Sequence, residues 1–165
     1  LLGDGDIHEP VVISYMDNVN EVSMGTNGAA LTGYTKILDG IKMMQDDNAG
    51  DTSAAIMAPR TWREFAGFVD STGQPLRRPQ AIENLPFLET SQVPINQTQG
   101  TATDASTIYL GDFSTLVVGF RSRLKIEVLK ERYRENLQVG FLAHLRVGIA
   151  AFHEEALARI VGITP

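Results

Sequence analysis

The chain has 165 residues, with 20 acidic and 14 basic side chains and a formal net charge of −6. This acidic balance argues against a dedicated nucleic-acid-binding protein, because such proteins gain affinity by neutralising phosphates. The chain contains no cysteine, which excludes disulfides, thiolate metal sites and cysteine nucleophiles.

The first third of the chain predicts a linker, a short strand and a helix. Residues 1–10 are rich in Gly and Asp and are typical of a linker, and the alternation at residues 11–15 predicts a short strand. Residues 17–33 are polar and predict a loop. Apolar residues then recur at helical spacing, which predicts a helix with Thr35 as its N-cap and an end in the polar turn at residues 46–52.

A strand and a second helix follow. The apolar run at residues 53–58 predicts a buried strand, and residues 60–69 predict a helix. This helix is expected to turn three apolar side chains toward the core, those of Trp62, Phe65 and Val69. Trp62 could instead serve as a binding platform, but its helical spacing favours the core. Residues 70–73 have the composition of a turn.

The middle of the chain predicts little regular structure. Residues 74–106 contain four prolines and are expected to be irregular. Within them, the Gln- and Thr-rich stretch from residue 92 onward predicts a surface loop. Short apolar runs predict strands at residues 107–110 and 116–120, with a turn between them.

The last third of the chain is the most regular part. Leu124, Ile126 and Val128 alternate with charged residues, which is typical of a half-buried strand with one face in water. Every odd position from Leu137 to Ala151 is apolar, which predicts a long strand. A strand of this length needs a partner of similar length, and the chain offers few. We therefore expect part of its sheet to be missing or to come from another molecule.

One cluster of charged residues has mixed signs. Such a cluster suits complementary contact with a like subunit, and a solvated strand face explains it equally well. A phosphate-binding stripe is disfavoured, because the acidic members would oppose it. The possible inter-subunit contacts are therefore Arg121, Arg123, Lys125, Glu127, Lys130, Arg132 and Arg134.

The sequence predicts no catalytic, cofactor-binding or metal-binding residue. It has no motif of a phosphate-binding loop, a dinucleotide-binding fold, a serine hydrolase or a zinc protease. The three histidines, His8, His144 and His153, have no second ligand at metal spacing. No run approaches the ~20 apolar residues of a membrane-spanning helix, so no membrane partner is expected.

Several short motifs resemble those of tailed-phage major capsid proteins with the HK97-like fold. Residues 58–62 (APRTW) resemble the family's NPRTW-type motif, residues 70–76 its kDs-G-p-l turn, and residues 109–114 its GDF element. Residues 84–86 (NLP) are similar to its GLPV stretch, with Asn where the family usually has Gly. Residues 134–158 resemble its final long strand. These motifs follow the family's order across nearly the whole chain.

The resemblance implies an α+β protein with the HK97-like capsid fold, comprising the axial domain plus the C-terminal strands of the peripheral domain. Residues 1–8 would be a connector, residues 9–120 the axial (A) domain, and residues 121–165 the return of the chain into the peripheral (P) domain. The family's N-terminal arm, extended loop and spine helix would precede Leu1.

Some members of this family join their subunits through a Lys–Asn isopeptide bond that a Glu assists. The resemblance places Gly140 at the Asn position and Val147 at the Glu position, and Asn136 lies out of register. We therefore expect no self-cross-linking in this chain.

The function implied by the resemblance is structural. The chain would be a subunit of an icosahedral bacteriophage or prophage capsid that self-assembles into capsomers and a DNA-containing shell, and it would be no enzyme and need no cofactor. Its partners would be copies of itself in pentamers and hexamers, scaffolding and portal proteins, and packaged DNA bound non-specifically. It would reside in the virion capsid, and in the cytoplasm of the bacterial host before assembly.

Two alternatives stay open at this point. One is an encapsulin-type shell protein of a bacterial nanocompartment. The other is an uncharacterised ligand-binding domain, for which a deep pocket lined by His144 or Asp112 would be evidence.

Overall fold

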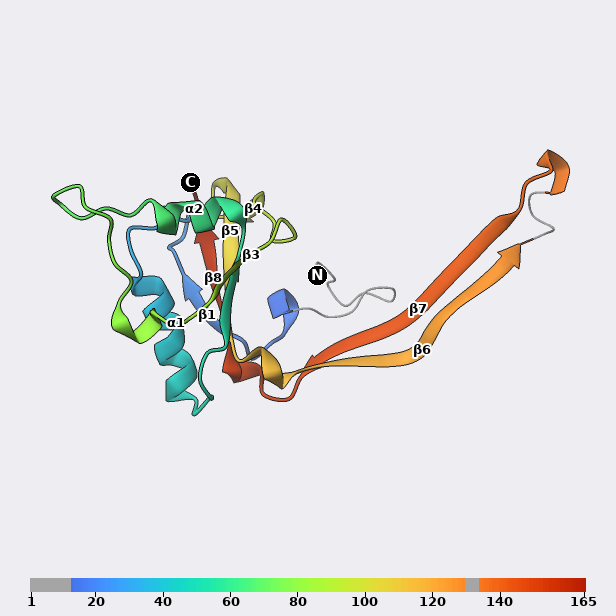
Figure 1. Cartoon of the computed structure of the whole chain (residues 1–165), viewed down its shortest axis with the longest axis horizontal. Helices are drawn as coiled ribbons and strands as arrows, with labels where there is room; N and C mark the ends of the chain where they lie inside the picture. Colours follow the sequence, from blue (N-terminus) through green and yellow to red (C-terminus); the bar gives the residue numbers. More distant parts are fainter. Residues whose placement is uncertain (1–12, 130–133) are drawn as a thin grey trace.

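The computed structural model describes residues 13–129 and 134–165 of the chain. They form two parts, which Figure 1 shows side by side. A body contains residues 13–115 and 152–165, and a β-hairpin of two long strands projects from it. None of the helices in these residues is long and apolar enough to cross a membrane.

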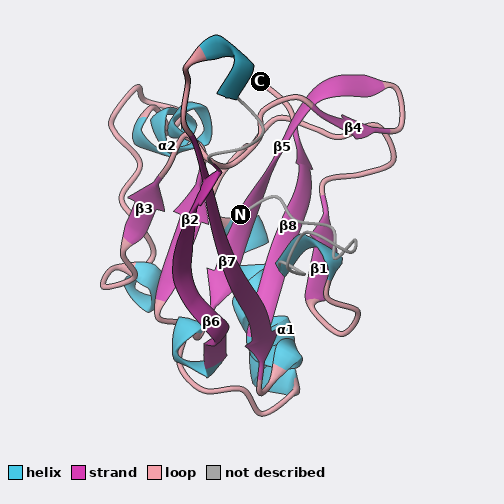
Figure 2. Ribbon diagram, turned by 90° about the vertical axis from the view of Figure 1, so that its right-hand side faces the viewer, coloured by secondary structure: helices cyan, strands magenta, loops and turns pink. Residues whose placement is uncertain are grey.

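The body is built on one sheet. Figure 2 shows its strands side by side, in the order β1 (Asn20–Ser23), β8 (Leu157–Ile163), β5 (Ala102–Gly111), β2 (Ala54–Met57) and β3 (Phe87–Glu89). A short strand, β4 (Gln97–Gln99), pairs with β5 outside this row. β8 is parallel to β1 and antiparallel to β5. The last strand of the chain therefore lies between β1 and β5. Pairings between residues far apart in the sequence hold the sheet together.

Alternation along the central strands separates the two faces of the sheet. Ile108 and Leu110 of β5 and Ile160 of β8 are fully buried in the main core, and α1 (Thr35–Asp46) packs over β8, β1 and β5. The helix comes close because Gly40 has no side chain, and a Cβ there would lie 2.8 Å from Leu110 Cδ1. This burial of aliphatic side chains is the main stabilising contribution in the body.

The second helix, α2 (Pro59–Ala66), completes the core. It follows β2 directly and begins at a proline, whose fixed φ and missing N–H suit the first turn of a helix. Its Phe65 is buried within a group of aromatic rings. The centroid of the Phe65 ring lies 5.4 or 5.5 Å from those of Tyr34, Phe68 and Phe87.

The described residues also form five short 3₁₀ helices. They are η1 (Ile13–Tyr15), η2 (Gln80–Ile82), η3 (Phe113–Thr115), η4 (Arg134–Asn136) and η5 (Glu154–Ala156). η3 and η5 lie at the two points where the chain leaves the body for the hairpin and returns from it.

The hairpin consists of β6 (Leu116–Leu129) and β7 (Gly140–Ala151), which pair antiparallel along nearly their whole length. Its base is the pair Leu116–Ala151. A second hydrophobic cluster holds this base to the body, where Leu116 and Ile149 pack with the buried Leu157. Beyond the base, most side chains of both strands are exposed.

Both helices and most of the predicted strands are confirmed. α1, α2, β2, β5 and β7 lie where the periodicity predicts them. Tyr34, not Thr35, is the N-cap of α1. The expectation that Trp62 and Val69 lie in the core is wrong, because α2 ends at Ala66 and the two side chains are 40% and 59% exposed.

Other expectations about the strands are wrong. Residues 13–15 of the predicted first strand form η1, and the rest of that strand lies outside the described residues. The predicted loop at residues 17–33 contains β1, and the irregular middle contains β3, β4 and the first half of β5, residues 102–106. The two strands predicted between residues 116 and 128 are one continuous strand. That strand is the partner of β7, so the chain does offer a partner of similar length. Whether a further part of this sheet is missing or comes from another molecule stays a prediction.

The domain division expected from the resemblance does not coincide with the body and the hairpin. The boundary at residue 120 falls inside β6, and β8 returns to the body sheet. The connector at residues 1–8 lies outside the described residues. The assignment of residues 9–120 to an axial domain and 121–165 to a peripheral domain stays a prediction.

Candidate inter-subunit surface

One face of the hairpin is apolar. Residues directly opposite each other in an antiparallel pair share a face, so the register joins four apolar pairs: Val118–Ile149, Phe120–Val147, Ile126–Ala143 and Val128–Phe141. Phe120 and Phe141 are 64% and 71% exposed. We call these eight residues the apolar face. The described part of the chain leaves most of it uncovered, which is unusual for a soluble monomer and typical of a surface that meets another protein element.

The opposite face of the hairpin carries charged and polar side chains beside a few apolar ones. It holds the pairs Ser122–Arg146 and Lys125–His144, and it also carries Glu127. Lys125 Nζ lies 2.5 Å from Glu127 Oε1. The hydrogen bond from Lys125, then the charge of Lys125 and that of His144, lower the pKa of Glu127 below its ordinary value. Because this ion pair is exposed to solvent, it contributes little to stability.

The register of the hairpin shifts on both sides of Ser122. Such bulges add residues to one strand, bend it and increase its twist. Just before the shifts, Gly119 faces Gly148 across the pair, and neither glycine would bring a Cβ into a close contact. The space that they leave is an open hollow on the hairpin, lined by these two glycines and by Phe120, Arg121, Arg146 and Val147.

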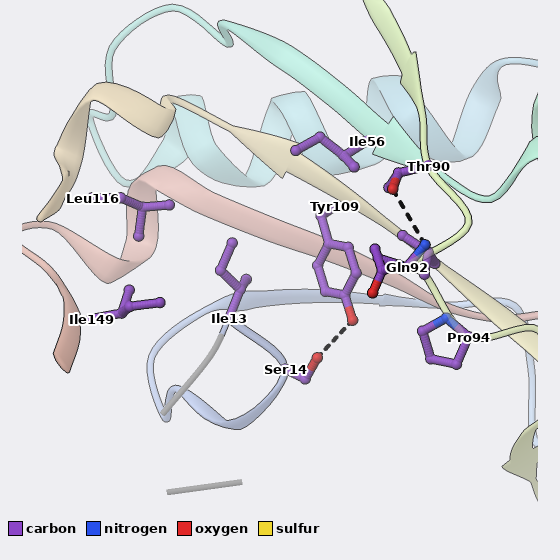
Figure 3. Close-up of a pocket in the computed structure, with 10 residues that line it drawn as sticks. Ile13, Ser14, Ile56, Thr90, Gln92, Pro94, Tyr109, Leu116 and Ile149 are labelled. Carbon is purple, nitrogen blue, oxygen red and sulfur yellow. Dashed lines mark hydrogen bonds between the residues drawn. The ribbon is translucent and has the colours of Figure 1, made fainter. Parts of the chain in front are cut away.

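A cavity of about 230 Å³ lies where the hairpin meets the body (Figure 3). Its walls come from η1, the sheet, the segment after β3 and the hairpin base, and none of the residues that line it is charged. Ser14 Oγ and Tyr109 OH lie 2.6 Å apart and satisfy each other. The Gln92 backbone N–H donates to Thr90 Oγ1 at 3.2 Å. Among the described residues that line it, the two hydroxyls that face each other are satisfied and no carboxylate, histidine or lysine is present, so nothing in this lining points to a catalytic site.

A comparison with models of protein families gives the identity of the fold family. The model described as the phage capsid family matches residues 2–162. The chain belongs to the phage capsid family. A search of curated proteins finds no match to this capsid-family chain.

Solved structures agree with the family. The capsid of the native GTA particle matches with a TM-score of 0.67 at 18% identity and covers 97% of this chain and 58% of its own. The Gordonia phage Cozz structure has the same TM-score at 15% identity, over 94% of this chain and 52% of its own. The SrpI encapsulin of Synechococcus elongatus PCC 7942 matches with a TM-score of 0.63 at 12% identity, over 93% and 57%.

These likenesses confirm the HK97-like capsid fold that the motifs imply. The capsid-family chain spans little more than half of the length of the chains that it matches. The family is one of structural proteins, and the long hairpin rather than a cleft is therefore the surface to consider.

The structure places four of the seven predicted contact residues on one strand. Arg121, Arg123, Lys125 and Glu127 all belong to β6. Lys130 and Arg132 lie outside the described residues, and Arg134 begins η4. Whether any of the seven contacts another subunit stays a prediction.

The candidate inter-subunit surface also includes polar residues of β7 and exposed apolar residues of the hairpin, which are not among the seven predicted contact residues. Arg146 and His144 of β7 lie opposite β6 on the polar face. The strand that carries Leu124, Ile126 and Val128 is predicted to be half-buried, whereas these side chains are 61%, 60% and 48% exposed. The alternation of β7 was the signal for both groups, because its even positions include these polar residues and its odd positions are apolar.

Proposed function

We propose that this chain is part of the structural subunit of an icosahedral phage or prophage capsid. The subunit self-assembles into capsomers and a shell that contains DNA, and it catalyses no reaction. Family membership and the fold support this proposal. The main observation on this chain that supports the proposal is the hairpin, which projects from the body and exposes the apolar face.

The physical argument is the free energy of burying that face. Full burial of one large apolar side chain stabilises a contact by about 1.5–3 kcal/mol. The apolar face holds several such side chains, and a shell repeats the same contact in every subunit, so modest interfaces suffice for closure. We propose that the apolar face becomes buried in the assembled full-length protein.

The proposed partners are copies of the same chain in pentamers and hexamers, together with scaffolding and portal proteins. Contact with packaged DNA would be non-specific, in keeping with the net charge of −6. The proposed location is the virion capsid, and the cytoplasm of the bacterial host before assembly.

Electron microscopy of the full-length protein tests this function. We expect closed shells or capsomer rings from the wild-type protein and from Phe141→Leu, which keeps the face apolar. Phe141→Asp should lose assembly, because it would bury a carboxylate without a partner. Circular dichroism should show an unchanged body in both variants, since Phe141 lies outside both core clusters. Wild-type protein that stays monomeric at every salt concentration and pH would contradict the proposal.

An encapsulin-type shell is the second candidate, and the match to the SrpI encapsulin favours it. A phage capsid would package nucleic acid, whereas a nanocompartment would package protein. The ratio of absorbance at 260 and 280 nm of purified native particles separates the two. Terminase, portal and protease genes beside the gene would also favour the phage capsid.

A further inference from the structure

We propose that the arginine-lined hollow of the hairpin receives Phe152 and the acidic end of the body of a second copy, so that the copies join head to tail. This inference rests on the proposed self-assembly and names the contact that it uses. It is argued from the shape of the hollow, the exposure of Phe152 and the charges of the two surfaces.

The hairpin is basic on a chain that is acidic as a whole. Within β6 and β7, Glu127 is the single acidic residue, and it already pairs with Lys125. Three exposed arginines remain, and among the described residues none of them has an acidic partner: Arg121, Arg123 and Arg146. Two of these, Arg121 and Arg146, line the hollow that the facing glycines leave open.

The complementary surface lies on the body beside the hairpin base, and we call it the acidic end. It comprises Asp17, Asp47, Glu154 and Glu155. Asn20 Nδ2 donates to Asp47 Oδ2 at 2.8 Å and to the Glu155 carbonyl at 3.0 Å, so this single amide holds two of the acidic residues together.

Neutral amides hold two of these carboxylates, those of Asp47 and Glu154, in place without cancelling their charge. Glu154 Oε2 accepts hydrogen bonds from Asn18 N at 3.2 Å and from Asn18 Nδ2 at 3.1 Å. Among the described residues, the one ion pair that involves the acidic end joins His153 Nε2 to Glu155 Oε2 at 3.3 Å. The acidic end is therefore an ordered surface that keeps its negative charge.

An aromatic side chain stands next to the acidic end. Phe152 follows the last residue of β7 and precedes η5, and it is 86% exposed. Aromatic side chains, Phe among them, are enriched in the cores of protein interfaces, where they fill pockets of the partner. A ring that enters the hollow would lie over the facing glycines, Gly119 and Gly148, beside the guanidinium groups of Arg121 and Arg146, which favour the face of an aromatic ring.

The contact must join two molecules, because the hairpin carries its arginines away from its own acidic end. The pair Ser122–Arg146 lies five positions along β7 from the base at Ala151, a separation of about 17 Å along an extended strand. Figure 1 shows the hairpin pointing away from the body over this length. A surface on the hairpin that meets a different surface on the body gives a heterologous contact, which repeats around a ring.

Charge reversal in the full-length protein tests the inference. The hairpin variant is Arg121→Glu with Arg146→Glu, and the body variant is Asp17→Lys with Glu155→Lys. Each should raise the protein concentration needed for assembly by at least about tenfold, because like charges then face each other. The four changes combined should restore assembly. The control Glu83→Lys with Glu89→Lys makes the same charge change at two exposed residues distant from the acidic end and should have no effect.

Mixing establishes that the contact is between molecules. The hairpin variant and the body variant fail separately, but each supplies the surface that the other lacks. An equal mixture should regain association, measured by native mass spectrometry. An independent variant, Gly148→Val, should fold normally, since a Cβ there meets nothing within 4 Å, and should block assembly by filling the hollow.

Three results would overturn the inference. The first is a combined variant that assembles no better than its parents. The second is a Gly148→Val variant that assembles normally. The third is a hairpin variant that forms shells without packaged DNA, together with a body variant that assembles like the wild type. That result would mean that the basic surface of the hairpin binds nucleic acid. In all three cases wild-type shells still form and the proposed function stands, whereas wild-type protein that never assembles would defeat both.

Discussion

Gly111, at the end of β5, illustrates how one residue limits what the fold accepts. It has φ +152°, and a Cβ there would lie 2.6 Å from the Ala156 carbonyl oxygen and 2.9 Å from Leu157 Cα. Both neighbours are backbone atoms of the segment that enters β8, so they cannot move aside as a side chain would. The glycine is the first residue of the GDF element. Close packing against the segment that enters β8 therefore explains why this position of the element is a glycine.

Gly111→Ala should destabilise the body by about 2 kcal/mol or more, because overpacking and backbone strain add. Urea unfolding should give a lower midpoint with an unchanged slope. Gly33→Ala is the matched control, since its Cβ would meet nothing within 4 Å and its φ is ordinary. Equal midpoints for the two variants would contradict this account of Gly111.

Sequence reasoning at the residue scale succeeded for α1 and failed for one face of α2. Thr61 and Phe65, four residues apart, form the buried stripe of α2. Trp62 lies one position further around the helix, which turns it toward solvent. The apolar spacing of residues 62, 65 and 69 fits a helical stripe equally well. Hydrophobic periodicity alone cannot choose between adjacent stripes in a helix of only two turns.

At the scale of elements, local patterns predicted strands but not their partners. β6 and β7 were each visible by alternation, yet the polar run at residues 121–123 looked like a break between two short strands. The structure accommodates that run with bulges, so the strand continues and matches β7 in length. β1 left no local signal, because only Val22 of its four residues is buried. It is a strand because it pairs with β8 at the other end of the chain.

Removal of the hairpin tests whether the two parts are separable. Residues 117–150 are replaced by Asn-Gly, a sequence that favours a tight turn between paired strands, which joins Leu116 to Ala151. The body should stay folded, because the main core cluster lies entirely outside the deleted segment. The loss of Ile149 from the second cluster should cost about 1–3 kcal/mol.

Thermal unfolding followed by circular dichroism measures that loss, and the full-length protein with the same deletion should no longer form shells. A shortened chain without a cooperative transition would contradict the division into a self-sufficient body and a hairpin used for assembly.

At the scale of the whole molecule, the fold could be inferred from an ordered set of short motifs, while the docking surface could not. The motifs report turns and strand ends that the backbone requires, and these are local. The hollow needs Gly119 and Gly148 to face each other, and the acidic end gathers residues from η5, from the position after α1 and from the segment between η1 and β1. Both arise from pairings between distant parts of the chain, which no local pattern encodes.

The separation of charge between hairpin and body also predicts how assembly depends on salt. Screening shortens the reach of exposed charges from about 10 Å at 0.1 M to about 3 Å at 1 M salt. Raising sodium chloride from about 0.05 to 0.5 M should therefore slow the assembly of full-length protein and raise the concentration at which it begins. Light scattering during assembly measures both quantities.

Salt affects burial of the apolar face in the opposite direction, so a comparison of two salts separates the apolar contribution to assembly from the charged one. Sulfate at matched ionic strength strengthens apolar burial while it screens charge, so it should slow assembly less than chloride does. The variant that combines both charge reversals should show the same salt dependence as the wild type, because opposite charges still meet. Assembly that accelerates steadily with sodium chloride would mean that the apolar face alone drives association and that the arginines of the hairpin do not orient it.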